Sequence, residues 1–381
     1  MKTFHCTHCQ AQVFFDNVAC LNCGSLLAYL PDHGSMAALR ESREGVYSPS
    51  GPDILGQYRL CANYPRHRVC NWAVPIKDPN PLCASCRLTE VIPQLSPLGK
   101  IAWQRLEAAK RRLVYGLSSL QLGLQRKSES VPQGVKFLFL QDATGPNGDT
   151  QRVLTGHDNG IITLNIDEAD DLKRERQRVT QHEPYRTLLG HFRHEIGHYY
   201  WDRLIRDGVL LDKFRRLFGD ERADYAAALR HHYRAGAPEN WQDTHISGYA
   251  TSHPWEDWAE SWAHFLHMTD ALETASALGL SLKPSRRGEP TGPSLPADQA
   301  VLDAGFDKMI DRWLTLTYVM NSLSRGLGLA DSYPFVLSPT VMDKLRFVFE
   351  AIVQQRKSDR CAQPDGPAEL TGRAPSGTTG F

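Results

Sequence analysis

The chain has 381 residues, which allows one large domain with a buried core and smaller modules beside it. Its 43 basic residues equal its 43 acidic residues, and this balance argues against a nucleic-acid-binding surface. The N-terminus has no apolar segment of signal-peptide length, and no stretch approaches the roughly 18 apolar residues of a membrane span, which predicts a cytoplasmic protein without membrane contact.

The first predicted element is a zinc ribbon over residues 1–40. Eight of the nine cysteines lie before residue 90, and six of them form three Cys-x-x-Cys pairs. In a chain without a secretion signal, such pairs indicate metal binding rather than disulfides. Two pairs joined by a hairpin-length span supply four thiolates for a tetrahedral zinc, and so short a segment needs a metal to fold. The four expected ligands are Cys6, Cys9, Cys20 and Cys23.

A second four-cysteine zinc module is expected over residues 41–95. Its ligands are Cys61, Cys70, Cys83 and Cys86, of which only the last two form a tight pair. The wide first gap leaves alternatives open: a metal shared in another way, His67 as a replacement ligand, or free thiols. Complete sulfur ligation leaves no open position for catalysis, so both zinc ions would stabilise a module that contacts a partner protein, a substrate or the rest of the chain.

Helical periodicity follows over about residues 96–126, and then two strand-like runs. Val135–Leu140 is apolar enough for the interior of a sheet. Ile161–Ile166 follows an Asn-Gly turn, with Arg152–Thr155 as its expected hairpin partner. Ile161–Ile166 is either an internal strand or an edge strand that pairs with an extended peptide.

The segment from Pro184 to Trp201 predicts a helix that carries His-Glu-Ile-Gly-His. His194 and His198 are four residues apart, so both imidazoles project from one helix face and can bind one zinc ion. Glu195 lies beside them, where it can take a proton from a zinc-activated water. His191 would crowd the same face and is interpreted as an ordinary helix-surface histidine.

The third zinc ligand has two candidate pairs downstream, Glu221 with Asp224 and Glu256 with Glu260. We expect Glu256 to bind the metal, because its helix carries a buried aromatic stripe and a buried carboxylate needs a partner. Glu260, four residues later, would then accept the far N–H of a ligand histidine. His264, two turns past Glu256, is expected to pack near the site without binding metal.

The run from Tyr249 to Asp270 resembles the metal-ligand helix of the anthrax lethal factor peptidase domain. In both proteins a tyrosine lies seven residues before the ligand glutamate, and a second glutamate follows four residues after it. In this sequence these residues are Tyr249, Glu256 and Glu260, and the His-Glu-x-Gly-His form also matches. This resemblance is limited to about residues 190–270. It implies that the phenol of Tyr249 donates to the oxyanion of the tetrahedral intermediate. His245 and His253 are weaker candidates for the same role.

The whole arrangement, with two N-terminal cysteine quartets, resembles a bacterial family of zinc-binding metallopeptidases. We therefore expect an α+β fold with a zincin-like, gluzincin-like domain over residues 96–360, built from a small, mostly antiparallel sheet and a helical C-terminal lobe. Residues 283–299 are expected to form a surface loop, and residues 361–381 a disordered tail.

The predicted activity is hydrolysis of a peptide or protein substrate, with one catalytic zinc and one or two structural zincs. Glu195 would act as general base and then pass the proton to the leaving amine. Two other functions stay open: a zinc-ribbon adaptor for protein or nucleic acid with a degenerate zincin core, and a zinc hydrolase of non-peptide amides.

Overall fold

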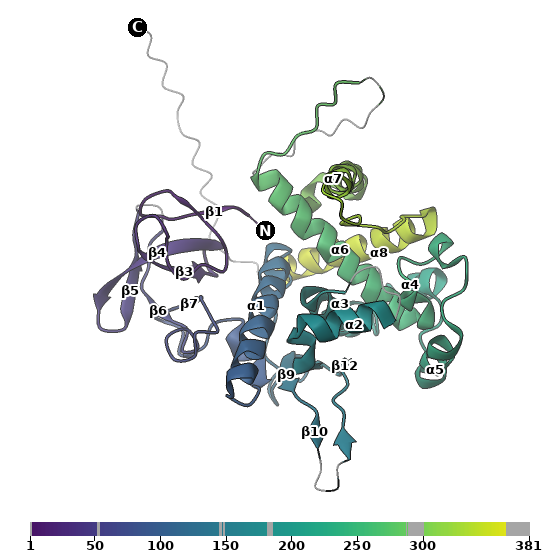
Figure 1. Ribbon diagram of the computed structural model, residues 1–381, viewed down its shortest axis with the longest axis horizontal. Helices are drawn as coiled ribbons and strands as arrows, with labels where there is room; N and C mark the ends of the chain where they lie inside the picture. Colours follow the sequence, from purple (N-terminus) through teal and green to yellow (C-terminus); the bar gives the residue numbers. More distant parts are fainter. Residues whose placement is uncertain are drawn as a thin grey trace.

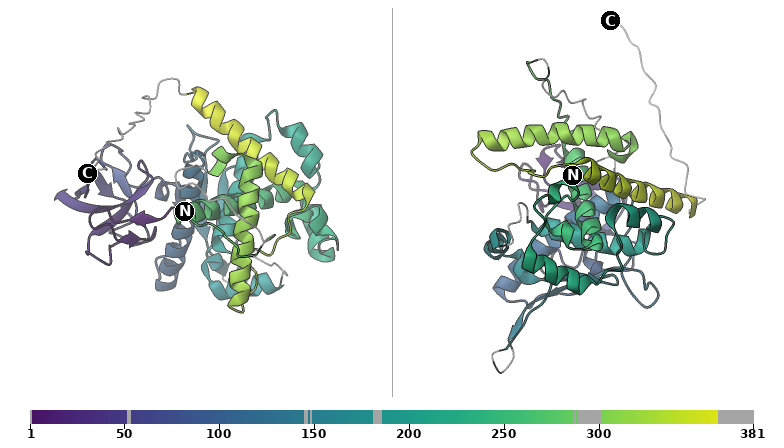
Figure 2. Two further views of the ribbon diagram at one scale, coloured as in Figure 1. Left: turned by 90° about the horizontal axis from the view of Figure 1, so that it is seen from above. Right: turned by 90° about the vertical axis from the view of Figure 1, so that its right-hand side faces the viewer.

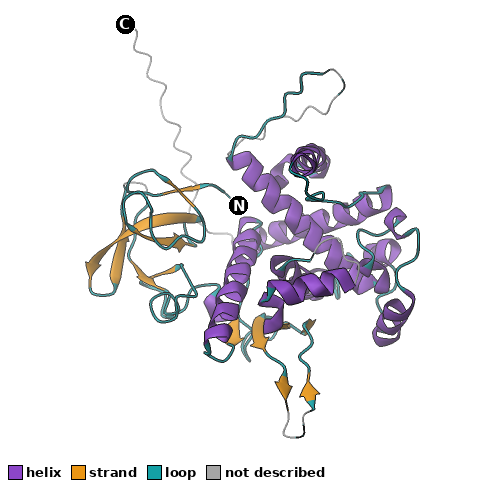
Figure 3. Ribbon diagram, viewed as in Figure 1, coloured by secondary structure: helices purple, strands orange, loops and turns teal. Residues whose placement is uncertain are grey.

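The computed structural model describes residues 2–51, 54–144, 147, 149–180, 186–286, 288 and 301–362. A module rich in strands forms one end of the molecule and a helical part forms the other, with helix α1 (Pro97–Ser119) between them (Figure 1). The left view in Figure 2 shows the same order, and Figure 3 shows how few strands the helical part contains.

The N-terminal module consists of a small hairpin and a five-stranded antiparallel sheet in which neighbours in sequence are neighbours in space. The strands are β1 (Phe4–His5), β2 (Gln12–Val13), β3 (Leu26–Leu30), β4 (Ser35–Arg43), β5 (Val46–Pro49), β6 (Tyr58–Leu60) and β7 (Ala73–Pro75). The boundary expected at residue 40 falls inside β4, so it does not separate two modules. Strands from both expected segments share one sheet and its core.

Helix α1 joins this module to the rest of the chain. Ser96 caps the helix by accepting a hydrogen bond from the backbone of Gly99, and Pro97 follows at its first position. Tyr115 packs against the rings of Phe4 and Phe15, with centroids 6.2 and 5.4 Å away. The N-terminal module and the helical part therefore share a continuous hydrophobic core.

A second sheet of four strands lies in the order β12 (Gly156–Asp158), β13 (Ile161–Asn165), β9 (Lys136–Leu140) and β8 (Thr89–Val91). The interior position expected for Val135–Leu140 is confirmed, because β9 lies between β13 and β8. Both pairings of β9 are parallel and only β12 with β13 is antiparallel, so the expected mostly antiparallel sheet is wrong. Parallel pairing brings together strands far apart in sequence, which local patterns do not reveal.

The strand Ile161–Ile166 is internal, so the edge-strand interpretation is wrong and β12 is the edge. Its hairpin partner is Gly156–Asp158 rather than Arg152–Thr155. The turn explains this register. Asn159 and Gly160 both have positive φ, 44° and 77°, and form a two-residue loop that places Asp158 opposite Ile161.

Within the helical part, α6 contacts α3, α4, α7 and α8, and the helices follow one another in chain order. They are α2 (Asp171–Thr180), α3 (Leu188–Leu204), α4 (Leu211–Phe218), α5 (Tyr225–Ala235), α6 (Pro254–Ala277), α7 (Phe306–Gly326) and α8 (Pro339–Ala362). A short hairpin of β10 (Ala143–Thr144) and β11 (Thr150–Gln151) projects from the sheet (Figure 1). Phe192 of α3 packs on Phe137 and Phe139 of β9, so α3 lies between the sheet and α6.

The fold is α+β, as expected. Most of the predicted surface loop at 283–299 and all of the predicted tail after Ala362 lie outside the described residues. Among the residues that the structure describes, no helix is both long and apolar enough to cross a membrane.

Candidate active site and metal centres

Helix α3 presents its two histidines to the first turns of α6. The helix begins at Leu188 with Thr187 as its cap, and Pro184, expected in its first turn, lies outside the described residues. The imidazole rings of His194 and His198 are 4.9 Å apart at their centroids. Helix α6 begins at Pro254, which places Glu256 in its first turn.

Three of the expected ligand side chains meet at this point. The ligand atoms of His194, His198 and Glu256 all lie within 4.8 Å of one another. Glu256 Oε2 is 2.8 Å from His194 Nε2 and 3.5 Å from His198 Nε2, and the Glu256 residue is only 1% exposed. Two imidazoles and one carboxylate are a donor set used by catalytic zinc sites with an open fourth position, so these residues fit a zinc ion.

The charges of this cluster reinforce one another. Burial disfavours a charged imidazole, but the carboxylates of Glu256 and Glu260 outweigh it and raise the pKa of His194 well above its usual range. Burial likewise disfavours the Glu256 carboxylate, yet His198 and His194 hold its pKa well below its usual range. A buried carboxylate and two imidazoles in this arrangement favour a cation at their centre.

Glu260 lies on the far side of His194 from Glu256. Nδ1 of His194 donates to Glu260 Oε1 over 2.7 Å, a contact through which this carboxylate can orient the imidazole. The hydroxyl of Ser247 donates to the other oxygen of Glu260 over 2.6 Å, and it also accepts from the backbone N–H of Ala250. No local sequence pattern predicts this contact of Ser247 with Glu260.

Gly197 allows α3 and α6 to approach closely. A Cβ atom at this position would lie 3.1 Å from Cα of Ala259 and 3.2 Å from the side chain of Trp262. The indole of Trp258 donates to the carbonyl of Gly197 over 2.9 Å. The buried aromatic stripe expected on α6 thus packs directly against the histidine-bearing helix.

The alternative third ligands have other partners. Glu221 forms an ion pair with Arg215, and Asp224 caps α5 by accepting from the backbone of Ala227. His191 lies 2.9 Å from a carboxylate oxygen of Glu168. None of these residues belongs to the metal-binding group found among the described residues.

The three nearby histidines His245, His253 and His264 also have structural partners. His253 caps α6 by accepting from the backbone of Trp255, and His245 lies 3.6 Å from Asp257. His264 is hydrogen-bonded to the hydroxyl of Tyr333 over 2.9 Å, and burial lowers its pKa to about 4, so it is neutral near pH 7.

The two side chains expected to be catalytic, Glu195 and Tyr249, lie beside the three candidate ligands. Glu195 is buried, its Oε2 has no hydrogen-bond partner among the described residues, and burial raises its pKa against the lowering effect of His194 and His198. The ring of Tyr249 lies 5.9 Å from that of His194, in the short 3-10 helix η4 (Tyr249–Ser252) that precedes α6.

Tyr225 also contacts the candidate ligands, although no local sequence pattern predicts it. It is the first residue of α5, and its hydroxyl donates to Glu256 Oε1 over 2.5 Å. The other oxygen of Glu256 faces the two histidines. The Tyr225 hydroxyl therefore fixes which carboxylate oxygen points to the metal-binding centre.

We expect Tyr225→Phe to weaken zinc binding at this centre by about 10–100-fold, the usual effect of removing a group that orients a metal ligand. Phenylalanine keeps the ring but lacks the O–H that holds Glu256 Oε1. Competition with a zinc chelator measures the dissociation constant, with Tyr233→Phe, an exposed position on the same helix, as matched control. Equal affinities of Tyr225→Phe and the unmodified protein would remove Tyr225 from the site.

The first cysteine quartet forms the cluster expected from its spacing. Sγ of Cys6 is 3.7 Å from Sγ of Cys23, and Cys9 is 3.7 Å from Cys20. Four sulfurs at zinc–sulfur distances of about 2.3 Å form a tetrahedron whose edge is about 3.8 Å, so the spacing suits zinc. Cys23 is exposed, whereas Cys6 and Cys20 are buried.

The second quartet lies at the junction with α1 and is buried at all four cysteines, Cys61, Cys70, Cys83 and Cys86. Sγ of Cys70 is 3.7 Å from Sγ of Cys83, the same tetrahedral edge. His67, an alternative ligand, instead packs against Trp103 with the rings tilted by 56° and their centroids 5.1 Å apart. Both quartets can therefore hold zinc with sulfur ligands alone.

Comparison with known proteins agrees with this geometry. A family model described as "Putative zinc-binding metallo-peptidase" matches residues 100–351, and a zinc-ribbon domain model matches residues 3–97. Uncharacterized proteins of Mycobacterium tuberculosis and Mycobacterium bovis are 42% identical over 355 residues, which cover 92% of this chain and 95% of each relative. No solved structure matches. The chain therefore belongs to this family of zinc-binding metallo-peptidases and carries an N-terminal zinc-ribbon domain.

Proposed function

We propose that the protein is a zinc-dependent peptidase, with the catalytic metal held by His194, His198 and Glu256. The observation that carries this proposal is the convergence of their ligand atoms within 4.8 Å beside the buried carboxylate of Glu195. Bound zinc would supply Lewis-acid polarisation of a carbonyl oxygen and of an attacking water. The stoichiometry we propose is one catalytic and two structural zincs per chain, and the site of action is the cytoplasm.

The side chains around the metal ligands have distinct roles in this proposal. Glu195 takes the proton of the attacking water and returns it to the leaving amine, a task favoured by the raised pKa of its carboxyl. Tyr249 donates its phenolic hydrogen to the developing oxyanion. Glu260 keeps His194 in the tautomer that binds metal through Nε2.

The edge strand β12 offers a place for an extended substrate. Strand β12 is paired only with β13 in its sheet, and it contacts α3. Its residue His157 lies 6.2 Å from the ring of His198, so the strand runs beside the metal ligands. A peptide added to this edge would place a carbonyl group near the centre, which supports a peptide rather than a compact small molecule as substrate.

Cleavage of a mixture of unfolded proteins tests the proposal. New peptide N-termini, identified by mass spectrometry, should form with the unmodified protein and be absent with the His194→Ala/His198→Ala variant. If neither protein forms new peptide N-termini but the unmodified protein hydrolyses simple aryl amides, the non-peptide hydrolase is favoured instead. Absence of all hydrolysis by a zinc-loaded protein would favour the adaptor.

A further inference from the structure

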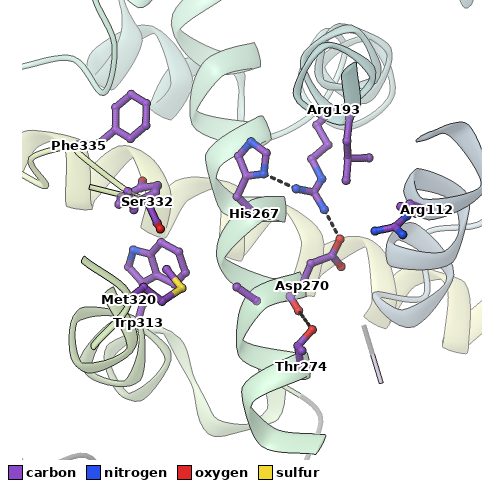
Figure 4. A pocket seen from close by; sticks show the side chains of 12 residues that line it. Arg112, Arg193, His267, Asp270, Thr274, Trp313, Met320, Ser332 and Phe335 are labelled. Carbon is purple, nitrogen blue, oxygen red and sulfur yellow. Dashed lines mark hydrogen bonds and ion pairs between the residues drawn. The ribbon is translucent and has the colours of Figure 1, made fainter. Parts of the chain in front are cut away.

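A cavity of about 340 Å³ lies between α3, α6 and α7, away from the metal ligands. It is in the volume range of small-ligand sites. Figure 4 shows the side chains that line it, with Arg193, His267 and Asp270 on one side and Trp313 and Met320 on another.

The cavity is separate from the proposed catalytic centre. Along α6, Glu260 and His267 are seven residues apart, which corresponds to roughly 10 Å of helix. His264 lies between them and is hydrogen-bonded to Tyr333, a residue of the cavity wall. A ligand of the cavity is therefore not a ligand of the catalytic metal.

One part of the cavity is apolar. Trp313 and Met320 of α7 face it together with Phe335, from the segment after α7, and Leu189 of α3. Large aromatic and thioether side chains of this kind contribute most of the binding energy for an aryl or alkyl group. The wall therefore suits a ligand with an apolar body.

The opposite part carries fixed hydrogen-bond donors. The guanidinium of Arg193 is 5% exposed and is bonded to Nδ1 of His267 and to the carboxylate of Asp270 (Figure 4). These contacts hold the guanidinium in place, and a guanidinium has five N–H donors. Burial lowers the pKa of His267 well below its usual range, so the ring is neutral and its Nδ1 accepts from Arg193.

Arg112 of α1 adds a second cation at the rim. It pairs with Asp16, and both side chains of this pair are about two-fifths exposed, so the pair contributes little and can be exchanged for another anion. Arg112 and Arg193 stand against the single carboxylate of Asp270 among the lining residues. Once Asp16 is displaced from Arg112, the lining carries two guanidinium groups and one carboxylate, and this excess of positive charge favours an anion.

We propose that this cavity binds an apolar carboxylate: an aryl or alkyl body against Trp313 and Met320, with its carboxylate at Arg112 and Arg193. Arginine binds carboxylates through paired N–H donors, and such charge-assisted bonds are about twice as strong as neutral ones. The same chemistry is presented by a free organic acid and by a peptide that ends in a large apolar residue.

Calorimetric titration of the zinc-loaded protein with 4-phenylbutyrate tests the proposal, with the uncharged 4-phenylbutanol as matched probe. We expect the acid to bind at least tenfold more tightly than the alcohol. Arg112→Gln should weaken binding of the acid about tenfold and leave the affinity for the alcohol unchanged. Arg105→Gln is the control, because Arg105 is an exposed, ion-paired residue of the same helix that does not line the cavity.

Ala271→Leu supplies a second variant, since it adds volume inside the cavity without removing a charge. This variant should bind both the acid and the alcohol more weakly than the unmodified protein. Three results would each overturn the proposal. They are equal affinity of the unmodified protein for acid and alcohol, an equal loss of affinity for the acid in Arg112→Gln and Arg105→Gln, and unchanged binding of both probes by Ala271→Leu. N-acetyl-Ala-Phe and its C-terminal amide separate the two sources: binding of the acid form alone identifies a peptide terminus, and binding of phenylbutyrate without either peptide identifies a free acid.

Discussion

Replacing Glu195 with glutamine is expected to lower the rate of peptide hydrolysis by roughly 10²–10⁴-fold, the contribution of a positioned general base. Glutamine preserves the size of the side chain and can fill the same buried position, but it cannot accept a proton. Glu195 lies outside the group of three ligand atoms, so the variant should retain its catalytic zinc. Initial rates at saturating and at low peptide concentration, together with zinc content, measure both effects.

The matched control for this experiment is Glu221→Gln. Glu221 lies in the other candidate pair for third ligand, but its carboxylate is paired with Arg215 away from the metal-binding group. It should keep full activity and full zinc content. A Glu195→Gln protein that holds its zinc and retains more than a tenth of the rate would exclude Glu195 as the base.

The second large effect is expected in stability, from Cys83→Ser in the buried quartet. Structural zinc supplies an apparent 10–16 kcal/mol to zinc fingers, and a loss of about 5 kcal/mol would lower the unfolding midpoint by roughly 10–20 °C. The damage should reach the catalytic domain, because Cys86 begins the short helix that leads directly into β8 of the second sheet.

Contacts around this quartet carry the effect further. Sγ of Cys86 lies 3.8 Å from Glu107, a fully buried carboxylate that also accepts from Thr89 of β8 and from Lys110. The ammonium of Lys110 lies over the ring of Phe139 in β9, 5.4 Å from its centroid. Loss of the zinc would disrupt the contact between Cys86 and the buried ion pair of Glu107 with Lys110. Removing one partner of a buried charged network is strongly destabilising.

Cys23→Ser provides the comparison in the first quartet. Cys23 is exposed, and the strands around it are held by a core that includes Phe15 and Tyr29. We expect one zinc to be lost or weakened but a midpoint shift less than half that of Cys83→Ser. Thermal unfolding followed by circular dichroism, with zinc content of each variant, measures both. Equal shifts in the two variants would contradict the distinction between a peripheral and a central quartet.

Residue spacing was enough to predict the local parts of the candidate site. A separation of four residues places His194 and His198 on one face of a helix, and the same separation on the next long helix places Glu256 and Glu260 on one face. That these two faces meet depends on packing between α3 and α6, for which the aromatic stripe was an indication. The same stripe supplied the choice of Glu256, because a carboxylate beside buried aromatic rings needs a partner, and the resemblance to a known ligand helix supplied the role of Tyr249.

Features that depend on distant contacts were not predictable from local patterns. Tyr225 reaches Glu256 from the start of another helix, and an isolated tyrosine after a capping aspartate has no distinguishing signal. The parallel pairing of β8 with β9 joins segments on either side of α1, so neither strand's pattern indicates its partner. The position of Ile161–Asn165 inside the sheet follows from the same long-range pairing.

Zinc content per chain tests the central claim most directly. Three ligand groups are present, so the unmodified protein should contain about three zinc ions and the His194→Ala/His198→Ala variant about two. The two quartets are separate from these histidines, and the variant should remain folded by circular dichroism. Equal zinc content of two or fewer in both proteins would contradict a catalytic zinc at His194, His198 and Glu256.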